Sequence, residues 1–184
     1  APVTCTATFT VEDAPLVVLT CPANETEASC QTQATINQKF NDWIATATKS
    51  GGCNAILTNN SGAAPDACGG AATVTFTVTG DCGAQASCTA VFTVTDAPAV
   101  VLTCPVNQTE ASCQTQSTIN QKFNDWIATA TKSGGCNAVL TNNGGAAPDA
   151  CRGSATVTFT VTSDCEAPVT CNATFTVDDA PLVV

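Results

Sequence analysis

Several residue types that carry chemistry are missing from this chain. Its 184 residues include no His, no Met and no Tyr, and five Lys and Arg stand against 15 Asp and Glu, for a net charge of -10. Without His there is no imidazole base and no His ligand for a metal, and without basic clusters nothing neutralises phosphates. These absences argue against most enzymes and against nucleic-acid or anionic-membrane binding.

Long apolar runs are missing as well. The longest, such as residues 16–19, fall far short of the roughly 18 to 20 residues that span a bilayer, so no membrane insertion is expected. No initiator Met and no charged-then-apolar leader opens the sequence, so we expect a secretion signal to have been removed or to lie outside this segment. The compartment must therefore be inferred from the cysteines.

Cysteine, by contrast, is abundant, with 13 in 184 residues. The spacing contains no Cys-x-x-Cys and matches no zinc ribbon or finger, so we interpret the cysteines as disulfide-forming residues of an oxidising compartment. Twelve are expected to form disulfides: Cys21, Cys30, Cys53, Cys68, Cys82, Cys88, Cys104, Cys113, Cys136, Cys151, Cys165 and Cys171. The thirteenth, Cys5, is expected to have its partner outside this segment.

The sequence repeats itself with a period of 83 residues. Residues 16–98 align with 99–181, and 67 of the 83 positions are identical, which leaves 16 differences. The expected organisation is a terminal strand of a preceding repeat at 1–15, repeat one at 16–98, repeat two at 99–181 and the start of a following repeat at 182–184. Strand runs into strand at 94–101 without a Gly/Ser linker, which predicts a stiff row of domains.

The sequence allows more than one pairing of the six cysteines within a repeat. The simplest scheme joins nearest neighbours: Cys21 with Cys30, Cys53 with Cys68, and Cys82 with Cys88. A strand-to-strand link such as Cys21 with Cys88 is the alternative. A Cys30–Cys53 bond is disfavoured, because a helix of about 17 residues, some 25 Å long, would separate the two.

One segment of each repeat has the period of an amphipathic helix. Apolar residues recur on one helical face at Ile36, Phe40, Trp43, Ile44 and Ala47. Thr32 or Thr35 is expected to cap the start of this helix, and Gly51 and Gly52 are expected to end it. We interpret its aromatic side chains as core rather than as a ligand site.

Alternation of apolar and Thr residues predicts half-buried antiparallel strands at 73–79 and 92–95, joined by a connection at 80–87. Shorter strands are expected at 17–20 and 55–58, followed by a loop at 59–70 that is rich in Asn, Gly, Ala and Pro. The sequence therefore predicts a compact two-layer unit of strands and one helix.

Four segments together resemble a known family: residues 19–24, 27–33, 51–60 and 88–94, which include Cys-Pro-Ala-Asn and Gly-Gly-Cys-Asn. They are similar to the hyalin-repeat-like (HYR-like) modules of very large secreted surface proteins of Bacteroidota, including the gliding-motility adhesin. The resemblance covers essentially all of both repeats. It implies an immunoglobulin-like β-sandwich, export, and assembly into long cell-surface filaments, whereas the predicted helix departs from the plain hyalin-repeat pattern. The expected fold is therefore mainly β: tandem immunoglobulin-like β-sandwich repeats, each with one amphipathic α-helix and stapled by disulfides. The resemblance supplies no catalytic residues.

Glu25 and Glu27 come closest to a catalytic carboxylate pair. Glu25 becomes Gln108 in the second repeat, whereas Glu27 remains Glu110. A pair that works by general acid and base catalysis needs both carboxylates, and the sequence has no Ser-His-Asp set, P-loop or G-x-G-x-x-G motif. We therefore expect no enzymatic activity.

Acidic residues gather just before the Ala-Pro pairs at the repeat junctions. Asp13, Asp96 and Asp179 are weak candidates for calcium shared between repeats. The middle junction has fewer carboxylates than the outer two, and the D-x-D-x-D-G loop is absent. Solvated turn residues are the preferred interpretation, and no cofactor is expected.

Four Asn-x-Ser/Thr sequons are candidate glycosylation sites: Asn24, Asn59, Asn107 and Asn172. Asn24 and Asn107 occupy the same position in the two repeats and are the stronger N-linked candidates. Exposed Thr and Ser are candidate O-glycan sites.

These observations favour a structural segment of a stiff extracellular filament or adhesin stalk on a bacterial cell surface, serving motility, attachment or biofilm. Its partners would be neighbouring repeats or identical chains, with surface glycans as further candidates. One alternative is a glycan- or protein-binding adhesion module that uses loops 59–70 and 83–87. Another is a filament subunit that polymerises by donating strand 5–11 or its counterpart 171–177.

Overall fold

The computed structural model describes residues 1–81 and 83–181, which form two compact units, Ala1–Thr95 and Asp96–Val184. Strands account for 38% of the chain and helices for 13%, so the prediction of a mainly β protein is confirmed. The first unit contains β1 (Val18–Thr20), β2 (Glu25–Glu27), α1 (Gln33–Ile44), β3 (Thr48–Ser50), β4 (Ile56–Asn59), β5 (Gly70–Thr79) and β6 (Gln85–Val94). The second contains β7 (Val101–Thr103), β8 (Gln108–Glu110), α2 (Gln116–Ile127), β9 (Thr131–Ser133), β10 (Val139–Asn142), β11 (Gly153–Thr162) and β12 (Val169–Val177).

Each unit is built on a four-stranded mixed sheet. In the first unit the strand order is β2-β6-β5-β4, and in the second it is β8-β12-β11-β10. The predicted hairpin is present as the antiparallel pair β5 and β6, but the predicted connection at 80–87 is too long, because β6 already begins at Gln85 and pairs with Thr79. β2 runs parallel to β6 at the sheet edge. A separate two-stranded sheet pairs β1 with β3, and β7 with β9. The two predicted short strands are confirmed within one residue, but β2 and β3 were not predicted.

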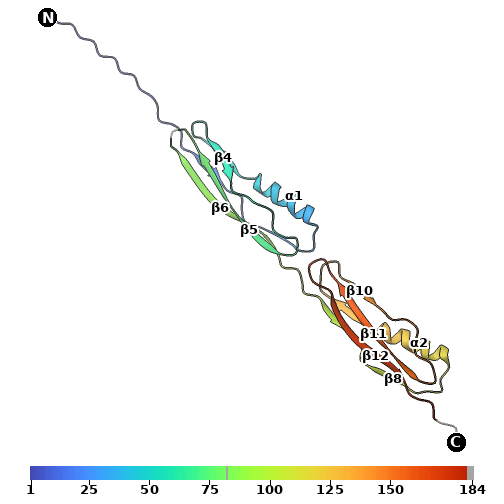
Figure 1. Ribbon diagram of the computed structural model, residues 1–184. Coiled ribbons are helices and arrows are strands. Elements are labelled where there is room, and N and C mark those ends of the chain that lie inside the picture. The colour runs from blue at the N-terminus through green and yellow to red at the C-terminus, as the bar shows by residue number, and fades with distance from the viewer. Residues whose placement is uncertain (82, 182–184) are drawn as a thin grey trace. The chain divides into compact units, whose positions relative to one another are not determined.

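The helix packs along one face of the sheet (Figure 1). The predicted helical face of Ile36, Phe40 and Trp43 is buried against the alternating apolar residues of β5 and β6. The Phe40 and Phe92 rings meet edge to face at 5.4 Å, and those of Trp43 and Phe76 at 6.1 Å. The indole Nε1 of Trp43 donates to the Ala23 carbonyl at 2.7 Å, so the buried polar atom is satisfied. The interpretation of these aromatics as core is therefore confirmed.

The helix begins as predicted but ends earlier. Thr32 is the N-cap, with its side chain accepting from the Thr35 amide at 3.1 Å. The helix ends at Ile44, and the prediction that Gly51 ends it is wrong, because β3 intervenes. Gly51 instead allows the backbone after β3 to pass close to the backbone at Leu16. It has φ +68°, and a Cβ there would lie 2.0 Å from the Leu16 carbonyl oxygen.

The nearest-neighbour disulfide scheme is wrong, and the alternative strand-to-strand link between Cys21 and Cys88 is confirmed. Cys21 bonds Cys88 in the first unit, across a Cα–Cα distance of 6.2 Å, and Cys104 bonds Cys171 in the second. The cause is the parallel register of β2 on β6, which pairs residues 67 apart, starting with Glu25 and Phe92. Cys21, ahead of β2, and Cys88, within β6, are also 67 residues apart, so they face each other in the same register. Four further cysteines are also disulfide-bonded: Cys30, Cys68, Cys136 and Cys165. Cys82 lies outside the described residues.

Two cysteines that were expected to form disulfides carry free thiols. They are Cys113 and Cys151, both exposed, although their counterparts in the first unit, Cys30 and Cys68, are bonded. The sequence next to this pair differs at one position, where Arg152 replaces Gly69. Gly69 has φ 142°, a conformation that L side chains rarely adopt, so the arginine changes the backbone beside Cys151.

We expect the variant Arg152→Gly to bond Cys113 to Cys151. A glycine at position 152 can adopt the positive φ that Gly69 has beside Cys68, the disulfide-bonded counterpart of Cys151. Refolding in a glutathione redox buffer, followed by thiol titration, should show two fewer thiols per chain than in the parent protein. Arg152→Lys is the control, and an equal thiol count in all three proteins would contradict the explanation.

Candidate functional site

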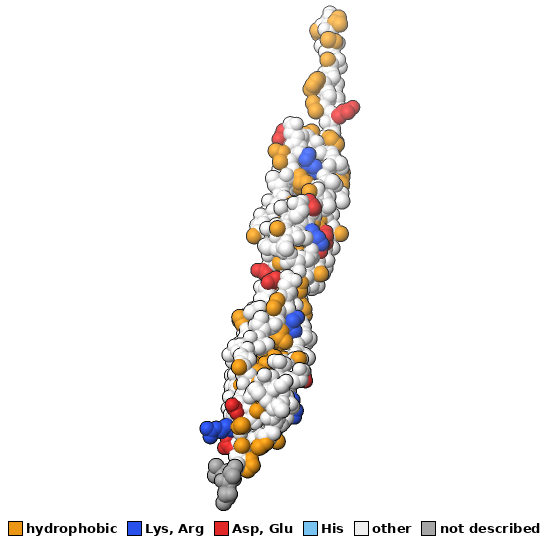
Figure 2. Space-filling model, turned by 90° about the vertical axis from the view of Figure 1, so that its right-hand side faces the viewer, with side chains coloured by type: hydrophobic (Ala, Val, Ile, Leu, Met, Phe, Trp, Pro, Cys, Tyr) orange, Lys and Arg blue, Asp and Glu red, His pale blue; other side chains and the backbone are white. Residues whose placement is uncertain are grey.

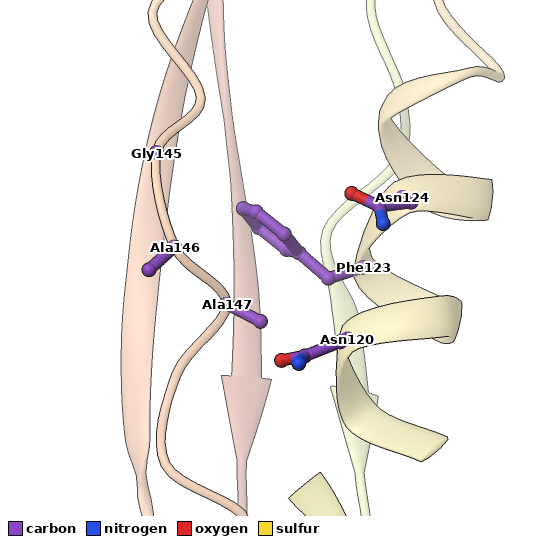
Figure 3. Close-up of a pocket in the computed structure, with 6 residues that line it drawn as sticks. All are labelled: Asn120, Phe123, Asn124, Gly145, Ala146 and Ala147. Atoms are coloured by element: carbon purple, nitrogen blue, oxygen red, sulfur yellow. The ribbon is translucent and has the colours of Figure 1, made fainter. Parts of the chain in front are cut away.

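Each unit has a small hollow between its helix and the long loop that precedes the central hairpin. In the second unit it measures about 230 Å³ and is lined by Asn120, Phe123, Asn124, Gly145, Ala146 and Ala147 (Figure 3). The hollow of the first unit measures about 250 Å³ and is lined by Asn37, Phe40, Asn41, Gly62, Ala63 and Ala64. All six lining residues are therefore the same in the two units. We call these two hollows the helix–loop grooves.

One glutamine fixes the loop wall of each groove. The side chain of Gln33 donates from Nε2 to the Pro65 carbonyl at 2.9 Å and accepts through Oε1 from the Ala67 amide at 2.8 Å. Gln116 makes the equivalent two bonds in the second unit. This role could not be predicted, since a glutamine on an exposed helical face gives no signal of a contact 32 residues away.

The lining of the groove determines what it can do chemically. Asn37 and Asn41 are exposed and one helical turn apart, whereas Phe40 between them is buried at the base. None of the lining residues carries a titratable group. The groove can therefore offer amide hydrogen bonds beside a small apolar surface, but no acid, base or nucleophile.

The stronger glycosylation candidates are exposed and have a structural role as well. The Oδ1 atom of Asn24 accepts from the Val91 amide, and that of Asn107 accepts from the Thr174 amide, both at 2.9 Å. These bonds link the start of the parallel edge strand to the sheet. Asn59 and Asn172 are exposed too, and Oδ1 of Asn59 accepts from the Ser61 amide at 3.0 Å.

The weak calcium candidates are Asp13, Asp96 and Asp179. Across residues 1–81 and 83–181, no group of three His, Cys, Asp or Glu side chains is placed to hold a metal ion. In the same residues, no helix is long and apolar enough to cross a bilayer.

An ion pair holds the helix to the edge strand of the sheet. Lys39 on α1 donates to the Glu27 carboxylate on β2 at 2.6 Å, and Gln31 donates to the same carboxylate at 3.2 Å. These hydrogen bonds, that from Lys39 first, lower the pKa of Glu27 below its ordinary value. In the second unit, Lys122 likewise lowers the pKa of Glu110.

We expect this pair to make stability depend on pH at the acid end. The pKa of Glu27 is lower in the folded than in the unfolded state, so its contribution is present above about pH 4.5 and is lost as the pH falls through the folded pKa. Glu27→Gln should cost about 1 kcal/mol at pH 6 and progressively less towards pH 3. Urea unfolding at each pH measures this. Glu12→Gln, at an exposed position, is the control and should show no such trend.

The free connection between the units is short, because hydrogen bonds fix the last residue before it to the first unit and the first residue after it to the second unit. Thr95 donates its amide to the Glu27 carbonyl at 2.9 Å, within the first unit. Pro98 accepts from the Gly135 amide at 2.8 Å, within the second unit. Asp96 and Ala97 alone separate these two anchored residues.

A further anchor is specific to the second unit. The amide of Val100 donates to the Glu166 carboxylate at 2.9 Å. Glu166 replaces Gly83 of the first repeat, so this bond has no side-chain equivalent there.

No protein-family model and no curated protein matches the chain. Among solved structures, human protocadherin-24 EC1-2 is 9% identical at a TM-score of 0.42, with 92% of this chain and 100% of that chain covered. Drosophila N-cadherin EC1-4 is 13% identical at a TM-score of 0.35; 92% of this chain is covered, and the chain spans only 50% of that structure. At these scores the likeness establishes neither a family nor a function.

Proposed function

We propose that this chain is a non-catalytic structural segment of an extracellular filament or adhesin stalk on a bacterial cell surface, built of hyalin-repeat-like modules. The observation that carries the proposal is the two-residue connection between residues anchored in separate units, Thr95 and Pro98. A connection of two residues, one of them followed by proline, restricts the backbone far more than a Gly/Ser linker would. Such a segment transmits position and force along an array.

The build of each unit supports this role. A disulfide ties the strand that leaves a unit to the chain just after its first strand, through Cys88 and Cys21, so tension on the chain is borne partly by a covalent bond. The face in Figure 2 has few, scattered charged side chains. We regard the unit as an immunoglobulin-like variant in which the helix and the two-stranded sheet take the place of a second full sheet. Motility, attachment and biofilm scaffolding would all use such a segment.

A distance measurement across the connection tests the proposal. A ketone-reactive nitroxide, which does not label the exposed thiols, is attached to p-acetylphenylalanine substituted at Lys49 in the first unit and Lys132 in the second, both exposed. Double electron–electron resonance then gives the distance distribution. We expect a narrow distribution in the parent chain, and a clearly broader one after Gly-Gly-Ser-Gly is inserted between Asp96 and Ala97. Equally broad distributions in both chains would contradict the proposed stiffness.

A second candidate function is an adhesion module that binds a glycan or a protein segment. The identity of the lining residues of the two helix–loop grooves favours it, since a ligand site used twice must present the same groups. A glycan array with the full chain tests this. Binding should be saturable and should be lost in the double variant Asn41→Arg, Asn124→Arg, which blocks both grooves, whereas Lys49→Ala serves as the surface control.

A further inference from the structure

The segment at residues 1–11 is almost a copy of a strand that closes the second unit. It differs from residues 167–177, which contain β12, at one of 11 positions, where Thr6 stands for Asn172. Phe175 and Val177 are 0% and 1% exposed in the core of their unit. Their counterparts Phe9 and Val11 are 91% and 74% exposed. Nearly the same peptide is therefore buried in one place and open to solvent in the other.

The two described units have no vacant position for this segment. β6 already lies between β2 and β5, and β12 already lies between β8 and β11. The cysteines of these strands, Cys88 and Cys171, are bonded to Cys21 and Cys104. A second copy of this chain offers the same two completed units, so polymerisation of identical chains by donation of this strand has no acceptor among the described residues.

We propose that residues 1–11 form the closing strand of a third unit of this fold, one that lacks its own closing strand. The segment would pair antiparallel with a strand of the β5 type and parallel with one of the β2 type, as β12 does in the second unit. Phe9 would then lie against the helix of that unit, as Phe175 does against Phe123. This deepens the proposed function, because it identifies the partner of the exposed segment in an array.

The same register identifies a disulfide for Cys5. Cys5 corresponds to Cys171, which bonds a cysteine 67 residues earlier in its unit. In the acceptor unit the partner is the cysteine at the Cys104 position. The two thiols lose two protons and two electrons to form the S–S bond, and glutathione disulfide, the oxidant, is reduced to two glutathione thiols.

A fused chain tests the inference. Residues 99–166 are placed ahead of Ala1 of the full chain, so that Ala1 follows Glu166 as Ala167 does in the parent sequence. This supplies a unit that is complete except for its closing strand. After folding in a glutathione redox buffer, we expect peptide mapping to find Cys5 bonded to the added copy of Cys104. Alkylation of Cys5 by iodoacetamide should fall at least tenfold relative to the unfused chain, and an unchanged rate with no such bond would overturn the inference.

One substitution in two contexts provides the matched control. Phe9→Asp should leave the unfolding of the unfused chain unchanged, since the side chain is exposed there, but should restore rapid alkylation of Cys5 in the fused chain. Loss of stability in the unfused chain would mean that the segment already packs against a described unit. The proposed stiffness is measured between Lys49 and Lys132, so it stands or fails independently of these results.

Discussion

Replacing Cys21 and Cys88 together by alanine is expected to lower the free energy of unfolding of the first unit by about 4 kcal/mol, and to leave the second unit unchanged. The bond closes a loop with a sequence separation of 67, and a constraint on so long a loop removes much entropy from the unfolded chain. A unit of this size has a small core, so the loss takes most of its stability margin.

The two tryptophans make this measurement selective. Trp43 lies in the core of the first unit and Trp126 in that of the second. In chains labelled with fluorotryptophan, each ¹⁹F resonance reports the denaturant unfolding of its own unit. The mirror variant, Cys104→Ala with Cys171→Ala, should shift the Trp126 transition alone. Equal destabilisation of both units by either variant would refute the independence of the two units.

The parts of the fold that could be predicted are those fixed by local periodicity. The spacing of Ile36, Phe40 and Trp43 determines which face of the helix is buried, whatever that face meets. In the same way, the alternation of apolar residues with Thr in β5 and β6 determines which side chains point into the core. These patterns are local, and the structure reproduces both.

The parallel edge strand β2 could not be predicted, because nothing local specifies it. Glu25–Glu27 is three residues long, polar and without a period, and its pairing with Phe92 depends on chain packing 67 residues away. The Cys21–Cys88 disulfide follows from this pairing, so for the same reason the sequence offered it only as the alternative to nearest-neighbour bonds. The bonds of Gln33 and the crossing at Gly51 likewise depend on distant segments that meet only in the folded unit.

Differences between the repeats bear on where a ligand would bind. Five of the 16 differences fall within 83–89 against 166–172, around the hairpin turn, whereas the helix–loop grooves are unchanged. One of the five, Glu166, anchors Val100 directly after the connection between the units. We therefore interpret the difference between Gly83 and Glu166 at the hairpin turn as one that anchors Val100, where the chain enters the second unit. The candidate binding function is assigned to the helix–loop grooves and not to the hairpin turn.

Phe92→Ala is expected to destabilise the first unit by about 3–5 kcal/mol, the usual cost of deleting a buried aromatic ring. Phe92 is 0% exposed and contacts both Phe40 and Trp43, so the cavity left behind is bounded by other rings that can collapse only partly. The corresponding variant Phe175→Ala should cost the second unit a similar amount. Fluorotryptophan-detected urea unfolding measures each unit separately.

The chain supplies its own control for this prediction in Phe9, which lies 83 positions ahead of Phe92 within a closely related peptide. Because Phe9 is 91% exposed, Phe9→Ala should change the stability of either unit by less than about 0.5 kcal/mol. Replacing Phe92 by alanine would thus lower the free energy of unfolding by several kcal/mol, whereas the same replacement at Phe9 would change it very little. The difference between the two values measures how much the packing of the closing strand against sheet and helix stabilises a unit. A substantial cost for Phe9→Ala would show that residues 1–11 already pack against this chain, and would remove the basis for assigning them to a third unit.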